Sequence, residues 1–155
     1  MLKKIGLGLV VILGLGLSGC ATVPTTTETE SNQAKKFELP EHDNAGIYVY
    51  RTNSSLGAAL KKDVFINGEC VGETAKGVFF YQEVAGDKEH SISTESEFSP
   101  NAITLFTEKG RLYFVEQYIK MGVFVGGAGV KIVDESVGRA EVLKTNMATK
   151  GTCSS

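Results

Sequence analysis

VFINGECVGE, residues 64–73, is the stretch that decides the fold. An apolar, β-branched run leads into Asn67-Gly68, and a second strand-like run follows it. An Asn-Gly pair between two such runs is the strongest short-range signal for a β-hairpin, because both residues adopt the positive φ angles of a two-residue turn. The stretch therefore predicts two antiparallel strands joined by a tight turn.

Further short strands are predicted on both sides of this hairpin. They cover residues 47–51, 76–84, 89–94, 103–107, 112–119 and 122–133. Strands at a spacing of about ten residues are typical of an all-β sandwich or barrel. Residues 134–147 are the one helix candidate, with Asp134 as its cap, although Gly138 weakens it. We expect an all-β, mainly antiparallel fold over residues 45–155: a single β-sandwich, immunoglobulin-like or prealbumin-like, with one C-terminal helix.

The hairpin and two later segments form a pattern. After residues 64–73 come GVFFY at 77–81 and VAGDKEHSI at 84–92. Over most of residues 45–147 this resembles a family of small bacterial lipoproteins whose β-rich domain has no known function. Residues 63–94 are also similar to the PEGA module, a short β-sandwich unit, but lack its proline before Gly86. These resemblances imply a fold and a compartment, and bring no catalytic residues.

The N-terminus has the layout of an export signal. Lys3 and Lys4 precede an apolar, glycine-containing run at 5–17, which is shorter than the roughly 20 residues of a membrane span. The run ends in LSGC, which resembles the lipobox of bacterial lipoproteins. That resemblance implies removal of residues 1–19 and attachment of fatty acyl groups, such as palmitate, to Cys20. The alternatives are an ordinary signal cut at Gly19 or Ala21, or an uncleaved anchor.

The segment after Cys20 reads as a linker. Residues 20–44 hold few apolar side chains before Phe37 and Leu39, so we expect an acylated cysteine on a flexible tether. By resemblance to the sorting rule of enteric bacteria, Ala21 implies passage to the outer membrane. Without Lys3 and Lys4, 14 of the 16 basic residues remain against 18 acidic ones, a formal charge of −4. This balance argues against nucleic acid as a partner.

The other two cysteines, Cys70 and Cys153, lie in a chain predicted to be exported. Thiols in an oxidising compartment tend to pair, so a Cys70–Cys153 disulfide is predicted. The alternative is a buried thiol at Cys70 and a loose one at Cys153. No Cys-x-x-Cys or histidine spacing indicates a metal site, and no cofactor is expected.

His90 is the residue considered for catalysis, because a strand places it on the same side as Ile92. A hydrogen-bonded structural histidine is the favoured interpretation, since no nucleophile is linked to it. Asp87, Glu89, Glu95 and Glu97 form a carboxylate-rich stretch that a solvated strand and loop also explains. The glycine-rich run at 122–130 lacks a phosphate-loop ending, so a bulge or bend of the sheet is the favoured interpretation, and docking to a partner or to the bilayer surface is the alternative. Phe79, Tyr81 and His90 are therefore put forward only as a binding surface.

Three functions remain open at this point. The first is a non-catalytic module in the bacterial cell envelope, anchored to the membrane through Cys20, that binds a protein or glycan partner. The second is an envelope enzyme of hydrolase type with a site near His90. The third is a structural or adhesive element that assembles through an open sheet edge. The sequence does not identify the partner, the ligand or the oligomeric state.

Overall fold

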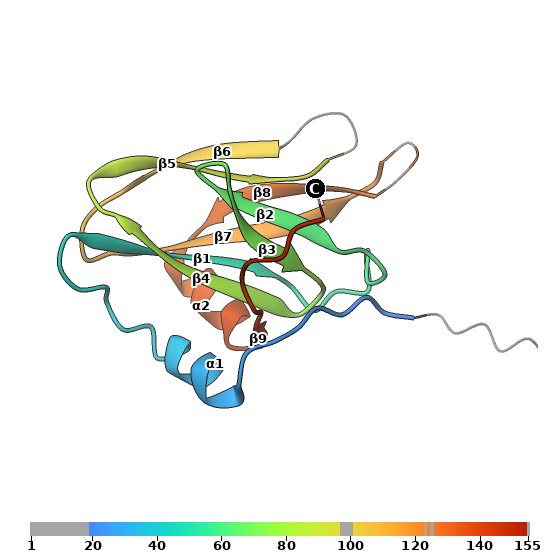
Figure 1. Cartoon of the computed structure of the whole chain (residues 1–155), viewed down its shortest axis with the longest axis horizontal. Coiled ribbons are helices and arrows are strands. Elements are labelled where there is room, and N and C mark those ends of the chain that lie inside the picture. Colours follow the sequence, from blue (N-terminus) through green and yellow to red (C-terminus); the bar gives the residue numbers. More distant parts are fainter. Residues whose placement is uncertain (1–18, 97–100, 123, 125, 155) are drawn as a thin grey trace, which may run out of the picture.

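Two β-sheets packed face to face form the body of the molecule in the computed structural model (Figure 1). The structure describes residues 19–96, 101–122, 124 and 126–154. The five-stranded sheet has the order β8 (Gly127–Val133), β7 (Leu112–Lys120), β1 (Asn44–Arg51), β4 (Val78–Ala85), β9 (Asn146–Met147). The four-stranded sheet has the order β3 (Glu69–Thr74), β2 (Lys62–Ile66), β5 (Lys88–Thr94), β6 (Asn101–Thr107). The predicted all-β sandwich is confirmed, and the sheets do not close into a barrel.

The predicted hairpin is formed by β2 and β3. Ile66 pairs with Glu69, and the two residues between them have φ angles of 54° at Asn67 and 79° at Gly68. Both angles lie in the left-handed region that a two-residue hairpin turn needs. The Asn-Gly signal therefore predicted both the turn and the pairing of the strands.

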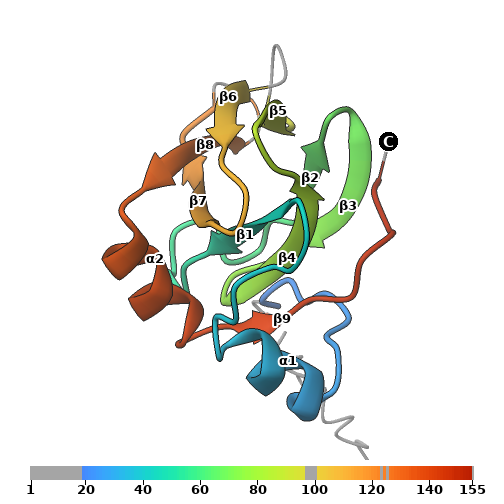
Figure 2. The ribbon, with the colours of Figure 1, turned by 90° about the vertical axis from the view of Figure 1, so that its left-hand side faces the viewer.

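Strand β1 lies at the centre of the larger sheet and is buried on both faces. It pairs antiparallel with β4 and parallel with β7. Ile47 and Val49 face the other sheet and join the core between the two layers. Tyr48 and Tyr50 point the opposite way into a second apolar cluster, which the helices cover. Figure 2 shows both helices on this outer side of the five-stranded sheet.

The C-terminal helix is shorter than predicted. Helix α2 covers Glu135–Val142, whereas the sequence predicted residues 134–147. Beyond it, the chain turns and Asn146 N–H donates to the carbonyl of Gly77, after which β9 runs parallel to β4. Backbone hydrogen bonds to a free strand edge replace those of further helical turns. Gly138 is required for packing, because a Cβ there would collide with the Phe114 side chain.

Residues 21–43 differ from the coil expected for a tether. Thr27 caps the helix α1 (Glu28–Ala34) in a reciprocal capping box with Glu30. The N–H of Thr26 donates to the carbonyl of Met147, and Phe37 is buried in the outer cluster. The buried Phe37 ring and the capped N-terminus of α1 hold this otherwise polar segment against the sheet.

Two other predictions are described by the structure only in part. Strand β8 begins at Gly127, so the strand predicted over 122–133 is shorter at its start. Residues 123 and 125 of the glycine-rich run lie outside the described residues, as do Glu97 and residues 1–18 of the predicted signal.

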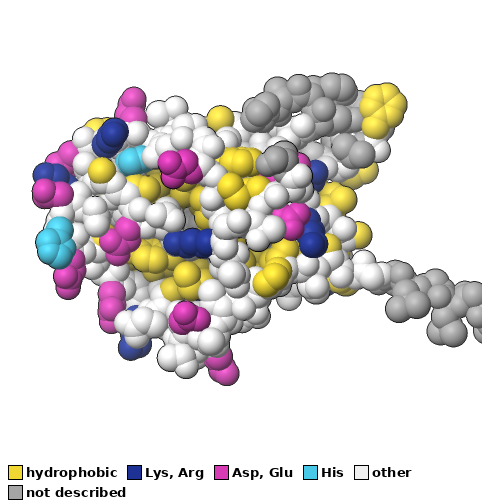
Figure 3. Space-filling view, in the orientation of Figure 1, with side chains coloured by type: hydrophobic (Ala, Val, Ile, Leu, Met, Phe, Trp, Pro, Cys, Tyr) yellow, Lys and Arg dark blue, Asp and Glu magenta, His cyan; other side chains and the backbone are white. Residues whose placement is uncertain are grey.

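The two ends of the sandwich differ in character. Because β1 and β7 are parallel, the segments that follow them lie at the same end: residues 52–61 after β1, and residues 121, 122, 124 and 126 after β7. The N–H of Ala21 donates to the carbonyl of Ala58, so Cys20 is also at this end, here called the Cys20 end. Figure 3 shows charged side chains gathered on the left, at the opposite end, and hydrophobic groups projecting on the right.

Candidate functional site

A cleft lies between the N-terminal segment and the outer face of the five-stranded sheet. Its volume is about 770 Å³, within the range of small-molecule and peptide sites. One wall is α1 with the segment that follows it, and the other is formed by β1 and β4. The lining residues are Thr26, Thr29, Glu30, Gln33, Ala34, Glu38, Leu39, Glu41, His42, Tyr48, Tyr81, Glu83 and Met147.

Two tyrosines from neighbouring strands form the sheet wall of the cleft. The ring centroids of Tyr48 and Tyr81 lie 4.7 Å apart. The Tyr48 hydroxyl donates to the carbonyl of Ala34 at 2.7 Å, which fixes α1 to the sheet. Burial raises the pKa of Tyr48 to about 12, and burial with the nearby Glu83 carboxylate also raises the pKa of Tyr81. Both phenols are therefore neutral hydrogen-bond donors at physiological pH.

Carboxylates surround these rings. Glu83 accepts hydrogen bonds from Asn44 Nδ2 at 3.1 Å and from the Tyr81 hydroxyl at 3.2 Å. Glu38 accepts one from Gln33 Nε2 at 3.0 Å. These bonds orient the carboxylates but leave oxygen lone pairs free for another donor.

The cleft therefore has negative electrostatic character. Glu30 and Glu41 add two more carboxylates to the lining, and the hydrogen bond from the Thr27 side chain lowers the pKa of Glu30. His42 supplies the one basic side chain among the lining residues, and its side chain is 84% exposed. An aromatic wall with anionic neighbours favours a positively charged group.

The structure does not bring together the three residues predicted as a binding surface. Phe79 is fully buried in the outer cluster, so it cannot belong to a surface. Tyr81 is half-buried and lines the cleft. His90 belongs to the other sheet and is 4% exposed. The alternation of β4 turns Phe79 and Tyr81 to the same outer face, where Phe79 is buried in the outer cluster and Tyr81 stays partly exposed in the cleft.

His90 has partners on both ring nitrogens. Nδ1 lies 2.9 Å from Asn67 Nδ2, and Nε2 lies 2.8 Å from the carbonyl oxygen of Ala85. An amide NH₂ and a carbonyl on these two sides correspond to a neutral ring that accepts at Nδ1 and donates from Nε2. Ile92 is buried on the same face, as predicted. This arrangement is that of a structural histidine, the favoured interpretation.

The other candidates for chemistry are dispersed. Asp87 pairs with Lys109 at 3.5 Å at one end of the sandwich, and Glu95 pairs with Lys62 at 3.4 Å at the other. Gly129 of the glycine-rich run lies in β8, where a Cβ would meet the Tyr118 ring. The carboxylates are thus separate surface ion pairs, and this glycine serves packing in a strand.

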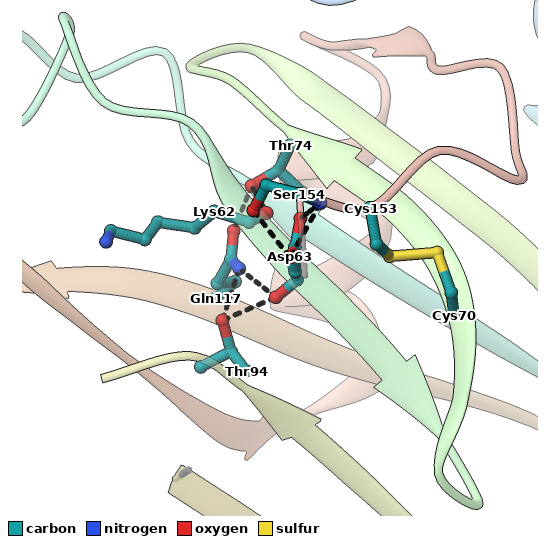
Figure 4. Close-up of a disulfide and its surroundings, with 8 residues drawn as sticks. All are labelled: Lys62, Asp63, Cys70, Thr74, Thr94, Gln117, Cys153 and Ser154. Atoms are coloured by element: carbon teal, nitrogen blue, oxygen red, sulfur yellow. Dashed lines mark hydrogen bonds between the residues drawn. A yellow bond between two sulfur atoms is a disulfide. The ribbon is translucent and has the colours of Figure 1, made fainter. Parts of the chain in front are cut away.

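Cys70 and Cys153 form a disulfide, which confirms the predicted pairing (Figure 4). It joins edge strand β3 to the C-terminal tail, whose Ser154 donates to the carboxylate of Asp63. The N–H of Gly151 donates to the carbonyl of Val71, so the tail crosses from one sheet to the other. Cys20 is the free cysteine, and it is exposed.

Within the described residues, no group of three or more histidine, cysteine or carboxylate side chains is placed to hold a metal ion. None of the helices in the described part of the chain is long and apolar enough to cross a membrane.

The sequence did not predict the cleft, because nine of its thirteen lining residues belong to the segment interpreted as a tether. The signal that identifies this segment as structured is the Thr27-Glu28-Thr29-Glu30 capping box, followed by Phe37. Without knowledge of the sheet, nothing in the sequence places that helix over Tyr48 and Tyr81.

Comparison with known proteins identifies a family without an assigned activity. A family model described as a protein of unknown function, DUF2846, matches residues 41–128. An uncharacterized protein of Haemophilus influenzae is 49% identical over 139 residues, which cover 90% of this chain and 82% of the relative. No solved structure matches. The predicted resemblance to a family of unknown function is therefore confirmed, while its lipoprotein and PEGA components stay predictions. The chain belongs to the DUF2846 family of proteins of unknown function.

Proposed function

We propose that this protein is a lipid-anchored component of the bacterial envelope and a non-catalytic binding module. Its ligand group is positively charged, and the site is the cleft between α1 and the five-stranded sheet. The observation that carries the binding function is the half-buried Tyr81 ring, which packs on the buried Tyr48 and lies with the Glu83 and Glu38 carboxylates in one cleft.

The anchor is proposed from the sequence LSGC and is supported by the position of Cys20. Its thiol is exposed and unbonded, whereas Cys70 and Cys153 are consumed in the disulfide. Acylation at Cys20 with more than one chain anchors a protein stably, since each buried methylene contributes about 0.8 kcal/mol. The residue after it, Ala21, favours the outer membrane as the destination.

The cleft favours an amine or guanidinium on a protein or glycan partner. Tyrosine faces attract cations, and the carboxylates accept hydrogen bonds from ammonium or guanidinium groups. The same carboxylates disfavour anionic ligands such as nucleic acid. Leu39, which is 64% exposed at the rim, offers an apolar contact beside the charged group.

A non-catalytic role accords with the surroundings of His90. Both of its ring nitrogens have partners, and the side chain is almost fully buried. A general base needs a ring nitrogen that can take the proton of a bound substrate, and both nitrogens of this ring are engaged by protein groups. We therefore do not propose the enzyme with a site near His90.

Site-directed photocrosslinking in living cells tests the binding function. A photoreactive phenylalanine analogue replaces Leu39 at the rim of the cleft, and a matched control replaces Val137, which is 49% exposed on α2. We expect a discrete crosslinked product with the partner when the photoreactive residue is at position 39, and none when it is at position 137. The yield of this product should fall when Glu83→Gln or Glu38→Gln is added to the variant, because each substitution removes one negative charge from the cleft. Equal adducts from both positions, or none from position 39, contradict the proposal.

Mass spectrometry of the protein purified from membranes tests the anchor separately. The expected mass is that of residues 20–155 with acyl chains on Cys20. A product that retains Met1, or one that begins without acyl groups, contradicts the anchor while leaving the cleft open to test.

A further inference from the structure

The Cys20 end of the sandwich carries the most exposed large hydrophobic side chains among the described residues. Met121 is 86% exposed and Phe124 is 85% exposed, both in the loop after β7. Leu56, in the loop after β1, is 54% exposed. Exposed aromatic and aliphatic side chains grouped at loop tips are unfavourable in water and mark an interaction surface.

The two loops are held against each other and against the start of the mature chain. A Cβ on Gly57 would lie 2.7 Å from the Ile119 side chain, and one on Gly126 would collide with Leu60. Ala21 N–H donates to Ala58 O at 2.9 Å. The residue proposed to carry the acyl chains is therefore next to one apolar loop, which is packed on the other.

A buried arginine gives the first of these loops its shape. Arg51 is 3% exposed, and its guanidinium donates to the carbonyls of Leu60 at 2.7 Å and Gly57 at 2.5 Å. Charge-assisted hydrogen bonds of this kind hold a loop in one conformation from within. Leu56 is thus presented outward on a loop that Arg51 fixes.

The opposite end of the sandwich has the character of a water-facing surface. Its loops contain Glu41, His42, Asp43, Asp87, Glu108, Lys109 and Arg111, and Lys109 bridges Asp43 at 3.1 Å. Figure 3 shows this concentration of charge, away from the hydrophobic groups at the Cys20 end. The loops at one end are therefore densely charged, whereas the end with the proposed anchor carries Met121, Phe124 and Leu56 beside the Lys61–Glu73 and Lys62–Glu95 ion pairs.

We propose that the Cys20 end docks on the bilayer that holds the acyl chains, with Leu56, Met121 and Phe124 inserted among the lipid headgroups and upper acyl chains. This inference rests on the proposed anchor. Because Ala21 is bonded to the domain, no long linker separates the lipid from the sandwich. Docking orients the molecule with its charged end away from the membrane. It also keeps the cleft at a fixed distance from the membrane surface.

Tryptophan fluorescence tests the docking, since the chain contains no tryptophan of its own. Phe124→Trp places a reporter at the Cys20 end, and Phe106→Trp is the matched control, because Phe106 is 54% exposed near the charged end on β6. Each acylated protein is reconstituted into phosphatidylethanolamine–phosphatidylglycerol vesicles with or without brominated acyl chains. We expect the reporter at 124 to lose about half or more of its emission to bromine, and the reporter at 106 to lose little.

A second measurement isolates the loops from the natural lipid. The free thiol of Cys20, in a protein of residues 20–155, is alkylated with a single fourteen-carbon chain, which alone gives only marginal membrane binding. The triple variant Leu56→Ser, Met121→Ser, Phe124→Ser should then have a vesicle partition coefficient at least about tenfold lower than that of the parent. The control variant Leu39→Ser, Phe106→Ser should partition like the parent.

The outcomes separate docking from anchoring. A reporter at 124 that bromine does not quench, in protein whose acylation at Cys20 is verified by mass, overturns the docking and leaves the anchor. A protein isolated from cells without acyl groups overturns both. A reporter at 124 whose emission shifts to the blue as the protein concentration is raised in the absence of vesicles overturns the docking as well, because a second copy then covers the loops.

Discussion

The side-chain amide Nδ2 of Asn67 lies 2.9 Å from Nδ1 of His90, across 23 residues of sequence. Asn67 also accepts, through Oδ1, the backbone N–H of Ser91 at 3.1 Å. One side chain at the turn of the β2–β3 hairpin is thus bonded twice to strand β5. The Asn-Gly turn does more than reverse the chain, because its asparagine joins the hairpin to the rest of its sheet.

Replacing His90 should reduce stability. His90→Ala leaves the Ala85 carbonyl and the Asn67 amide without this partner and opens a cavity, so we expect a loss of about 2–4 kcal/mol in the free energy of unfolding. Urea unfolding followed by circular dichroism measures it. His42→Ala, on a side chain that is 84% exposed, is the control and should change stability by less than about 0.5 kcal/mol. A His90→Ala protein as stable as the parent would contradict the structural role.

The disulfide should be a major contributor to stability. Cys70 and Cys153 are 83 residues apart, and closing a loop of that length stabilises a fold by up to about 4–5 kcal/mol in the chain-entropy model. The double variant Cys70→Ser, Cys153→Ser should lose most of this, and reduction of the parent should have the same effect. Thermal unfolding with and without reductant provides the measurement. Cys20→Ser should leave the midpoint unchanged, and an equal shift for that variant would contradict the assignment.

The parts of the fold that depend on local sequence were predictable. The Asn67-Gly68 turn and the alternation of β1 follow from residue types within a few positions, and these elements form as expected. The end of α2 was not predictable, because it is decided by the edge of β4, which accepts β9 some 70 residues later in the chain. The cleft required the same long-range information, since Tyr48 and Tyr81 become its wall only when α1 lies over them.

Phe37 should account for most of the docking of the N-terminal segment. Its ring lies 5.4 Å from that of Tyr48, and the Arg139 guanidinium lies 4.7 Å from its centroid. Phe37→Ala should cost about 3–5 kcal/mol, as for other buried aromatic side chains. Leu39→Ala, only two residues away but 64% exposed, should cost less than about 0.5 kcal/mol. Denaturant unfolding compares the two variants, and similar losses in both would show that Phe37 is not the anchor.

The same substitution should open the cleft. With Phe37→Ala, hydrogen–deuterium exchange of residues 28–38 is expected to rise before that of β1, because α1 is attached through Phe37 and the Tyr48–Ala34 hydrogen bond. Uniform acceleration across the sheet would instead indicate global unfolding.

The capping box of α1 should make stability depend on pH. The side-chain hydrogen bond from Thr27 and then its backbone hydrogen bond lower the pKa of Glu30 from the ordinary value of 4.5. A carboxyl group with a lowered pKa in the folded state contributes stability above its unfolded-state pKa and loses it as the pH falls through the folded-state value. The stability difference between the parent and Thr27→Val should therefore be largest near neutral pH and narrow below pH 4.5. Thr29→Val, exposed on the same helix, is the control and should give a difference that does not change with pH. Urea unfolding of the three proteins between about pH 3 and pH 7 measures these differences, and parallel curves for parent and Thr27→Val would contradict the role of Glu30 in the cap.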